Sequence, residues 1–189
     1  IGACDTIWLQ VEQDSLLNEV VARCKETAQR VGIVVPSQAE AQRAIGCGAD
    51  CLIVKGHEAG GRVGEETTFV LLQRLLGMTD LPVIAWGGIG ANAAAVCRIA
   101  GAAGVALDWQ LALTRESPID AEIKKRIASL DAGDSIVVPL SDAHGFRCLR
   151  PSNADTGDDL SGRVQEYRDA GETHHAALED AVWSLYDRK

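Results

Sequence analysis

Short apolar runs, separated by segments with helical spacing, recur along the first two thirds of the chain. Their content of β-branched residues predicts strands that are buried on both faces, as in a parallel sheet. Four runs are clear, at residues 31–35, 51–54, 83–86 and 105–107, and two weaker ones lie at 6–11 and 135–139.

Helical segments lie between these strands, at residues 38–45, 66–76 and 91–100. Ser37 is placed to cap the first helix, while Gly46 and Gly101 are placed to end the first and third. A unit of about 30 residues therefore repeats as strand, loop and helix. This is the βαβ pattern, whose ligands gather at the carboxyl ends of the strands.

Two glycine-rich segments follow directly on two of the strands. The run from Lys55 to Gly64 comes after strand 51–54, and Gly87-Gly88-Ile89-Gly90 comes after strand 83–86. Glycine lets the backbone approach a planar ligand closely, and unpaired N–H groups before a helix can hold an anion. The simpler alternative is that Gly87 and Gly88 only permit a tight turn.

With these motifs the chain resembles the flavin-dependent nitronate monooxygenases, also called 2-nitropropane dioxygenases, and the related FMN-dependent enoyl reductases of bacterial fatty-acid synthesis. The resemblance extends from about residue 31 to about residue 151, and it depends on the order and spacing of several short pieces. These are Gly48-Ala49-Asp50, Gly56-His57-Glu58-Ala59-Gly60-Gly61, Pro82-Val83-Ile84-Ala85 with Gly87-Gly88-Ile89, and Gly101-Ala102-Ala103-Gly104-Val105 before Glu116-Ser117. The resemblance implies a (β/α)8 TIM barrel that binds FMN at the carboxyl ends of its strands.

A complete barrel needs eight strands and about 250 residues, more than this chain of 189 residues offers. We therefore expect an α/β fold that is the C-terminal half of a TIM barrel, over residues 1–150, and a fragment of a longer polypeptide. The alternative is a genuine half-barrel protein. Residues 151–189 are expected to form an acidic linker and appended helices at 160–170 and 173–186. A half-barrel has two bare edges, which the remaining half of the barrel, in the same or another chain, would pair.

The resemblance also implies roles for particular residues, and here the chain departs from the family. Glu-Ala-Gly-Gly is commonly followed by a histidine that faces the flavin, whereas this chain has Arg62. Arginine stays protonated and can only stabilise an anion, so His57 is the candidate acid or base. His57 and Arg62 are thus the candidate catalytic residues, with a structural hydrogen-bonding role as the alternative for His57. Lys55 is a candidate contact to flavin or substrate, or else a surface ion pair.

For the cofactor, the resemblance implies that Gly60, Gly61, Gly87 and Gly88 approach FMN. The family usually carries Gly-Thr near the phosphate, where this chain has Asp108 followed by a tryptophan. A carboxylate there would repel the phosphate by on the order of a kcal/mol or more. The chain therefore keeps the Gly87-Gly88 part of the expected phosphate site and departs from the family at Asp108.

Composition narrows the function classes. A net charge of -9 argues against nucleic-acid binding. No apolar run reaches the ~18 residues of a membrane helix, and no signal peptide is visible, so no membrane partner is expected. Of the six cysteines only Cys47 and Cys51 are close, without a second ligand pair. We therefore expect no metal site, and reduced thiols in a cytoplasmic protein.

Two functions follow as hypotheses. The first is an FMN-dependent oxidoreductase that acts on a nitronate or on an enoyl or acyl-type small molecule. The alternative is a non-catalytic, flavin-free barrel that serves as a structural or docking domain of a large modular polyketide synthase. The sequence does not distinguish a monooxygenase from a reductase.

Overall fold

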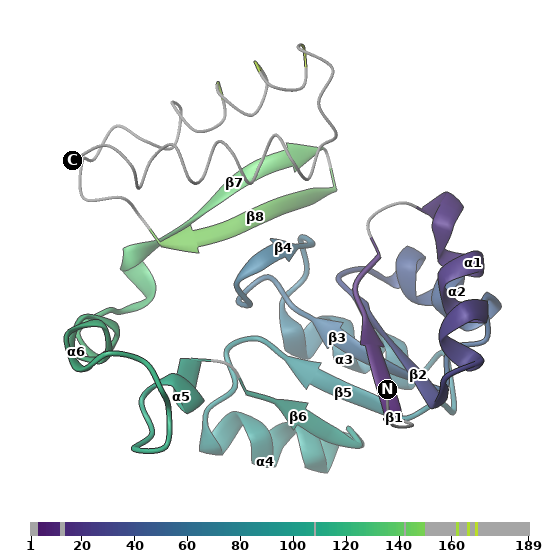
Figure 1. Ribbon diagram of the computed structural model, residues 1–189, viewed down its shortest axis with the longest axis horizontal. Helices are drawn as coiled ribbons and strands as arrows, with labels where there is room; N and C mark the ends of the chain where they lie inside the picture. The colour runs from purple at the N-terminus through teal and green to yellow at the C-terminus, as the bar shows by residue number, and fades with distance from the viewer. Residues whose placement is uncertain are drawn as a thin grey trace.

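The computed structural model describes residues 4–11, 14–107, 109–141 and 143–149, together with the single residues 162, 166 and 169. Figure 1 shows the arrangement of the elements. In chain order they are β1 (Cys4–Leu9), α1 (Asp14–Lys25), β2 (Ala28–Val35), α2 (Gln38–Gly46), β3 (Cys51–Lys55), β4 (Gly61–Val63), α3 (Thr68–Leu76), β5 (Val83–Trp86), α4 (Ala91–Ala100), β6 (Gly104–Ala106), α5 (Trp109–Ala112), α6 (Ala121–Ala128), the 3-10 helix η1 (Ala132–Asp134), β7 (Ser135–Ser141) and β8 (His144–Leu149).

Five strands form a parallel sheet in the order β1-β2-β3-β5-β6. All four pairings between neighbours are parallel, for example Ile33 beside Leu52 and Ile53 beside Ile84. This sheet with its outer helices is a half-barrel, so the fold class expected from the sequence is confirmed. The four clear strands are present, and the weaker run at 6–11 is represented by β1.

The two faces of the sheet follow from the alternation of side chains along each strand. Residues such as Ile33, Leu52 and Val83 point towards the helices and belong to one apolar core with Leu71 and Leu75 of α3. Because burial of apolar side chains is worth roughly 25 cal/mol per Å², this helix-facing core holds the sheet and helices together. The opposite face is the inside of the half-barrel.

The inside of the half-barrel carries the intervening residues, among them Trp8, Ile53, Lys55 and Trp86. Trp8 of β1 stands beside Gly32 of β2, and a Cβ atom at Gly32 would collide with the Trp8 ring. Glycine at this position therefore makes room for the indole.

The run at 135–139 is a strand, β7, but the expectation that it belongs to the barrel is wrong. It pairs with β8, which pairs in turn with the short strand β4, and all three are antiparallel. This separate sheet lies beside the half-barrel, with β4 nearest to the parallel strands and the β7–β8 hairpin farther out (Figure 1). The helices expected at 160–170 and 173–186 lie outside the continuously described residues.

The three expected helices are present as α2, α3 and α4, although α2 runs through Gly46 and α3 begins at Thr68; α1, α5 and α6 were not expected. Ser37 caps α2, since its hydroxyl accepts the Glu40 backbone N–H at 3.3 Å. Gly101 ends α4 in the left-handed region, with φ of 110°. In the described part of the chain, no helix is long and apolar enough to cross a bilayer.

Candidate functional site at the carboxyl ends of the strands

Lys55 ends strand β3 on the inside of the half-barrel. It is 3% exposed, so it is not the surface residue that the ion-pair alternative required. Its Nζ atom lies 4.6 Å from the centre of the Trp86 ring and 3.3 Å from Gln10 Oε1. The ends of β1, β3 and β5 thus bring an amide, an ammonium group and an indole together at one edge of the sheet.

The glycine segment after β3 passes directly over this ammonium group. Gly61 has φ of 78°, and a Cβ atom there would be 3.4 Å from Lys55 Nζ. Gly61 begins β4, where it stands opposite Arg147 of β8. Glycine at position 61 therefore lets the backbone approach the buried ammonium group of Lys55 closely.

His57 is held firmly within the same loop. Its backbone N–H donates to the Glu66 carbonyl at 2.8 Å, and its carbonyl accepts from Arg147 Nε at 2.7 Å. The Nδ1 atom lies 3.0 Å from the Gly64 carbonyl oxygen. An acceptor at that position assigns the neutral-ring proton to Nδ1, and it leaves the lone pair of Nε2 as the basic site.

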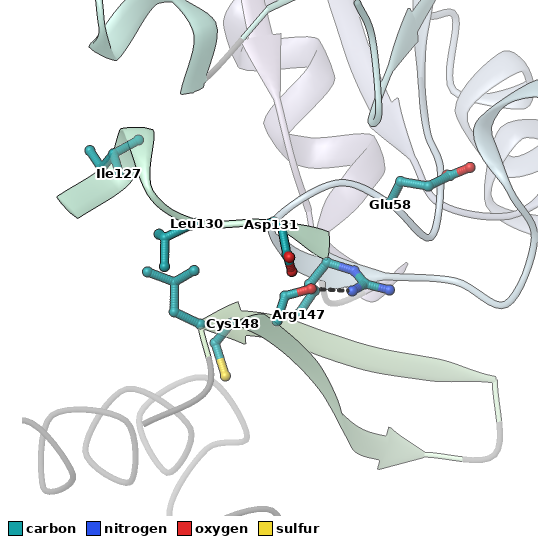
Figure 2. A pocket seen from close by; sticks show the side chains of 9 residues that line it. Glu58, Ile127, Leu130, Asp131, Arg147 and Cys148 are labelled. Carbon is teal, nitrogen blue, oxygen red and sulfur yellow. Dashed lines mark hydrogen bonds between the residues drawn. The ribbon is translucent and has the colours of Figure 1, made fainter. Parts of the chain in front are cut away.

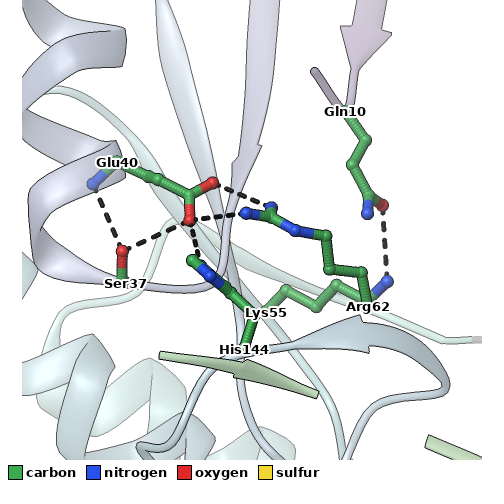
Figure 3. A network of polar contacts seen from close by, with 6 residues as sticks. All are labelled: Gln10, Ser37, Glu40, Lys55, Arg62 and His144. Carbon is green, nitrogen blue, oxygen red and sulfur yellow. Dashed lines mark hydrogen bonds and ion pairs between the residues drawn. The ribbon is translucent and has the colours of Figure 1, made fainter. Parts of the chain in front are cut away.

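Arg62 reaches across this edge to Glu40 of α2, with which it forms an ion pair (Figure 3). The guanidinium donates twice to the carboxylate, at 3.0 and 3.1 Å, and both side chains are about nine-tenths buried. The same carboxylate lies 2.6 Å from Nε2 of His144, at the start of β8. Arg62 therefore joins α2, β4 and the β7–β8 hairpin, and its charge is already balanced.

The second glycine segment packs against the first. Gly87 and Gly88 have φ of 121° and 63°, and a Cβ atom at Gly87 would be 2.9 Å from the Ala59 backbone N. Below them, the Glu58 carboxylate accepts from both the backbone N–H and the hydroxyl of Thr68 at 2.9 Å. A tight turn is thus one real function of Gly87, while Glu58 occupies the anion position at the start of α3.

The start of α4 is different, because among the described residues no side-chain cap bond is found there. Gly90 is the N-cap residue, and a Cβ atom there would meet nothing within 4 Å. The preceding turn is fixed by Gln110, whose Nε2 donates to the Ile89 carbonyl at 2.6 Å. Uncapped N–H groups beside an open space fit the phosphate of FMN. Asp108, the expected point of repulsion, lies outside the described residues.

A cleft of about 270 Å³ opens beside this edge, between the Glu58–Gly60 loop and the segment from α6 to β8 (Figure 2). Arg147 lies in it, and its Nη1 donates to Ser135 Oγ at 2.7 Å. Burial raises the pKa of the Cys148 thiol in the same lining. The sequence reasoning missed this cleft, because its walls come from segments about 70 residues apart.

No group of three or more possible metal ligands occurs within the described residues. Burial, with the nearby Asp50 carboxylate as a second cause, raises the pKa of the Cys51 thiol.

The family follows from comparison with known proteins. A model described as nitronate monooxygenase matches residues 9–171. The chain belongs to this family. The resemblance seen in the sequence is therefore confirmed, while its polyketide synthase setting stays a hypothesis.

Two curated relatives share the name (3aS,4S,5R,7aS)-5-hydroxy-7a-methyl-1-oxo-octahydro-1H-indene-4-carboxyl-CoA dehydrogenase. The one from Mycobacterium tuberculosis (strain ATCC 25618 / H37Rv) is 33% identical over 165 residues, which are 81% of this chain and 45% of the relative. The one from Rhodococcus jostii (strain RHA1) is 29% identical over 170 residues, which are 88% of this chain and 48% of the relative. The chain therefore spans about half the length of the curated relatives it matches.

Solved structures agree with the family. FabK from Thermotoga maritima superposes with a TM-score of 0.72 at 27% identity, over 86% of this chain and 50% of that one. A nitroalkane oxidase from Streptomyces ansochromogenes superposes with a TM-score of 0.59 at 22% identity, over 77% of this chain and 45% of that one. The second likeness shows the fold alone.

Proposed function

We propose that this half-barrel carries part of the active site of an FMN-dependent oxidoreductase. The observation that supports the proposal is the contact between two glycine segments at the carboxyl edge, directly beside the buried ammonium group of Lys55. Gly60, Gly61, Gly87 and Gly88 would approach FMN, and the N–H groups that begin α4 would hold its phosphate. When bound, FMN supplies the capacity to accept and return electrons.

The residues of the chain supply charge and proton transfer. Lys55 stabilises negative charge that develops on the flavin or on the substrate, because an ammonium in a low-dielectric site acts strongly at short range. His57, with its proton on Nδ1, offers Nε2 as the acid or base. Arg62 contributes through structure, since Glu40 already balances its charge.

The proposed substrates are a nitronate or an enoyl or acyl-type small molecule. A nitronate already carries negative charge on its oxygens, and an enoyl compound develops such charge on its carbonyl oxygen when it is reduced, so both suit a buried cation. The name of the curated relatives is that of a dehydrogenase of a carboxyl-CoA, which supports the acyl class.

The remaining half of the barrel is the proposed partner of this half, in the same or another chain. In the described part of the chain β1 and β6 each pair on one side only, and Ile99 of α4 is 87% exposed. Two open parallel edges with apolar surface beside them require further strands and helices.

The test of cofactor binding uses Gly90 in the full-length protein. Gly90→Asp adds a favoured N-cap residue without a clash, so the flavin-free fold should be kept or gain a few tenths of a kcal/mol. The same carboxylate would face the phosphate, at a cost of about 4 kcal/mol per charge pair at 4 Å and dielectric 20, or about a thousandfold in affinity. Gly90→Ser is the matched control, because it caps the helix without the charge.

The parent should show a flavin absorption band and release FMN on denaturation, and Gly90→Asp should lose both. A parent without flavin would defeat the proposal. Equal flavin content in the parent and in Gly90→Asp would show that the start of α4 does not bind the phosphate.

The second candidate function is the flavin-free barrel with a structural or docking role, as in a modular polyketide synthase. The observation that favours it is Arg62, which stands where the family commonly has a flavin-facing histidine and which is bound to Glu40. This candidate predicts no flavin band in the parent, and normal assembly of the larger protein after His57→Ala.

A further inference from the structure

We propose that Trp86 is the positioning residue that holds the Lys55 ammonium group at the carboxyl edge, and that this fixed cation raises the reduction potential of the bound flavin. The inference rests on the proposed function, and it deepens it by naming the groups that set the redox balance of the same site. Lys55 is more deeply buried than any other charged residue that the structure describes, at 3% exposed.

The register of the parallel sheet brings Lys55 and Trp86 side by side. They are the last residues of β3 and β5, and they are partners across the two strands. Partners in a sheet point their side chains to the same face, here the inside of the half-barrel. The Nζ atom lies 4.6 Å from the centre of the Trp86 ring. Tryptophan attracts a cation more strongly than the other aromatic side chains, and the attraction grows where water is excluded.

Gln10, directly after β1, holds the same ammonium group from a second side. Its Oε1 atom lies 3.3 Å from Lys55 Nζ (Figure 3). Lysine has a flexible stem of four carbons, so a single contact does not fix the place of its charge. A ring from β5 and an amide oxygen from the end of β1 restrict it together. Neither of these two groups carries a formal charge.

The ammonium group is fixed beside both glycine segments. A Cβ atom at Gly61 would be 3.4 Å from Lys55 Nζ, and Trp86 leads directly into Gly87 and Gly88. These are the segments that are proposed to approach FMN. The position that Trp86 gives to the cation is therefore next to the proposed flavin site.

Two other charged side chains near this edge are engaged by the protein. Arg62 forms an ion pair with Glu40. The Glu58 carboxylate accepts from the backbone N–H and the hydroxyl of Thr68. Changes at Lys55 and Trp86 therefore test one cation while these contacts are kept.

A cation that is fixed beside a flavin favours its reduced form. Two electrons and one proton are added on reduction, so the reduced ring carries one negative charge more than the oxidised ring. Two opposite charges attract strongly where little water screens them, and a charge near the ring is one means by which proteins tune a flavin. Lys55 should therefore increase the affinity of the site for reduced FMN relative to oxidised FMN.

The test measures the affinity of the full-length protein for oxidised FMN and, without oxygen, for FMN reduced by dithionite. Lys55→Met should lower the ratio of reduced to oxidised affinity by about tenfold or more, which is about 30 mV for a two-electron couple. Trp86→Leu should lower the ratio by about threefold or more, while Trp86→Phe keeps an aromatic face and should stay within about twofold. A change that only loosens the fold weakens both forms alike and leaves the ratio unchanged.

Trp8→Leu and Lys25→Met are the matched controls. Trp8 is another indole on the inside of the half-barrel and is 43% exposed. Lys25, in the last turn of α1, is an exposed lysine that pairs with Asp50. Since the first change removes no charge and the second removes a charge that solvent screens, both variants should keep the ratio within about twofold of the parent.

A Lys55→Met variant with the ratio of the parent would overturn the inference and leave the proposed function standing. Equal effects of Trp86→Leu and Trp86→Phe would show that the ring does not position the cation, and would overturn the role of Trp86. A parent that binds neither form of FMN would overturn the inference together with the proposed function. If Lys55→Met does not fold, the two Trp86 variants decide alone.

Discussion

Glu40→Ala should be the most destabilising simple change at the carboxyl edge. The Glu40 carboxylate receives two bonds from Arg62 at 3.0 and 3.1 Å and lies 2.6 Å from His144 Nε2. The side chains of Arg62 and Glu40 are 12% and 9% exposed. Removing the carboxylate would leave the guanidinium buried without a counter-charge, which typically costs 3–5 kcal/mol.

That cost is a large part of the stability of a domain, about 5–15 kcal/mol. With a urea slope of about 2 kcal/mol/M, a loss of about 4 kcal/mol moves the unfolding midpoint by about 2 M. Arg62→Met should cost less, about 1–3 kcal/mol, because Glu40 keeps His144 and Ser37 as donors.

The assay is urea unfolding of the full-length protein, followed by tryptophan fluorescence and circular dichroism. Arg74→Met is the control, because Arg74 pairs with Glu66 at the same distance of 3.0 Å but is 54% exposed. An exposed pair is worth about 1 kcal/mol or less. The double variant Glu40→Met with Arg62→Met should recover part of the loss, since no charge is stranded.

A cost below about 1 kcal/mol for Glu40→Ala would refute the reasoning, because it would mean that Arg62 finds water or another partner. If the Arg62→Met variant kept the stability of the parent but lost turnover, Arg62 would be a catalytic residue and not a structural one.

Three further outcomes follow from burial and packing. The pKa of the Cys97 thiol is raised by burial, so iodoacetamide at pH 8 should modify it more slowly than Cys24, as peptide mapping would show. Because the folded-state pKa lies above the unfolded value of about 8.5, the stability due to Cys97 is complete below that value and is lost as pH rises through the folded pKa. Gly56→Ala should cost roughly 1–3 kcal/mol or more in thermal unfolding, since its Cβ would overlap the first residue of α3; Gly46→Ala, in open space at the end of α2, should be neutral or stabilising. Residues 1–189 expressed alone should self-associate in size-exclusion chromatography, and Ile99→Asp should reduce this; a compact monomer would contradict the open-edge reasoning.

Local periodicity determined most of the half-barrel. The apolar runs at 31–35 and 51–54 became β2 and β3, and Ser37 began α2 as its capping chemistry predicted. Helical spacing of apolar residues would also have predicted α1, which was not expected: Leu17 and Val21 are four residues apart, and both are buried. Spacing along one element is a local property, so the sequence contains it directly.

The placement of the candidate site also followed from sequence, because Lys55 is the last residue of β3 and Gly87 directly follows β5. Parallel strands end at one edge, and so these residues had to meet there. What the sequence did not contain was their surroundings, such as the burial of Lys55 against Trp86.

Tertiary structure alone decided the partners of the polar residues. The Arg62 to Glu40 pair spans 22 residues, and the contact of His144 with Glu40 spans 104. The strand that contains Arg62 exists only because β8, more than 80 residues later, supplies its hydrogen bonds. Such contacts have no period along the chain, since they depend on which surfaces the folded half-barrel brings together. The glycine motif thus predicted that the Arg62 guanidinium would lie near the expected flavin. In the folded protein this guanidinium forms an ion pair with Glu40.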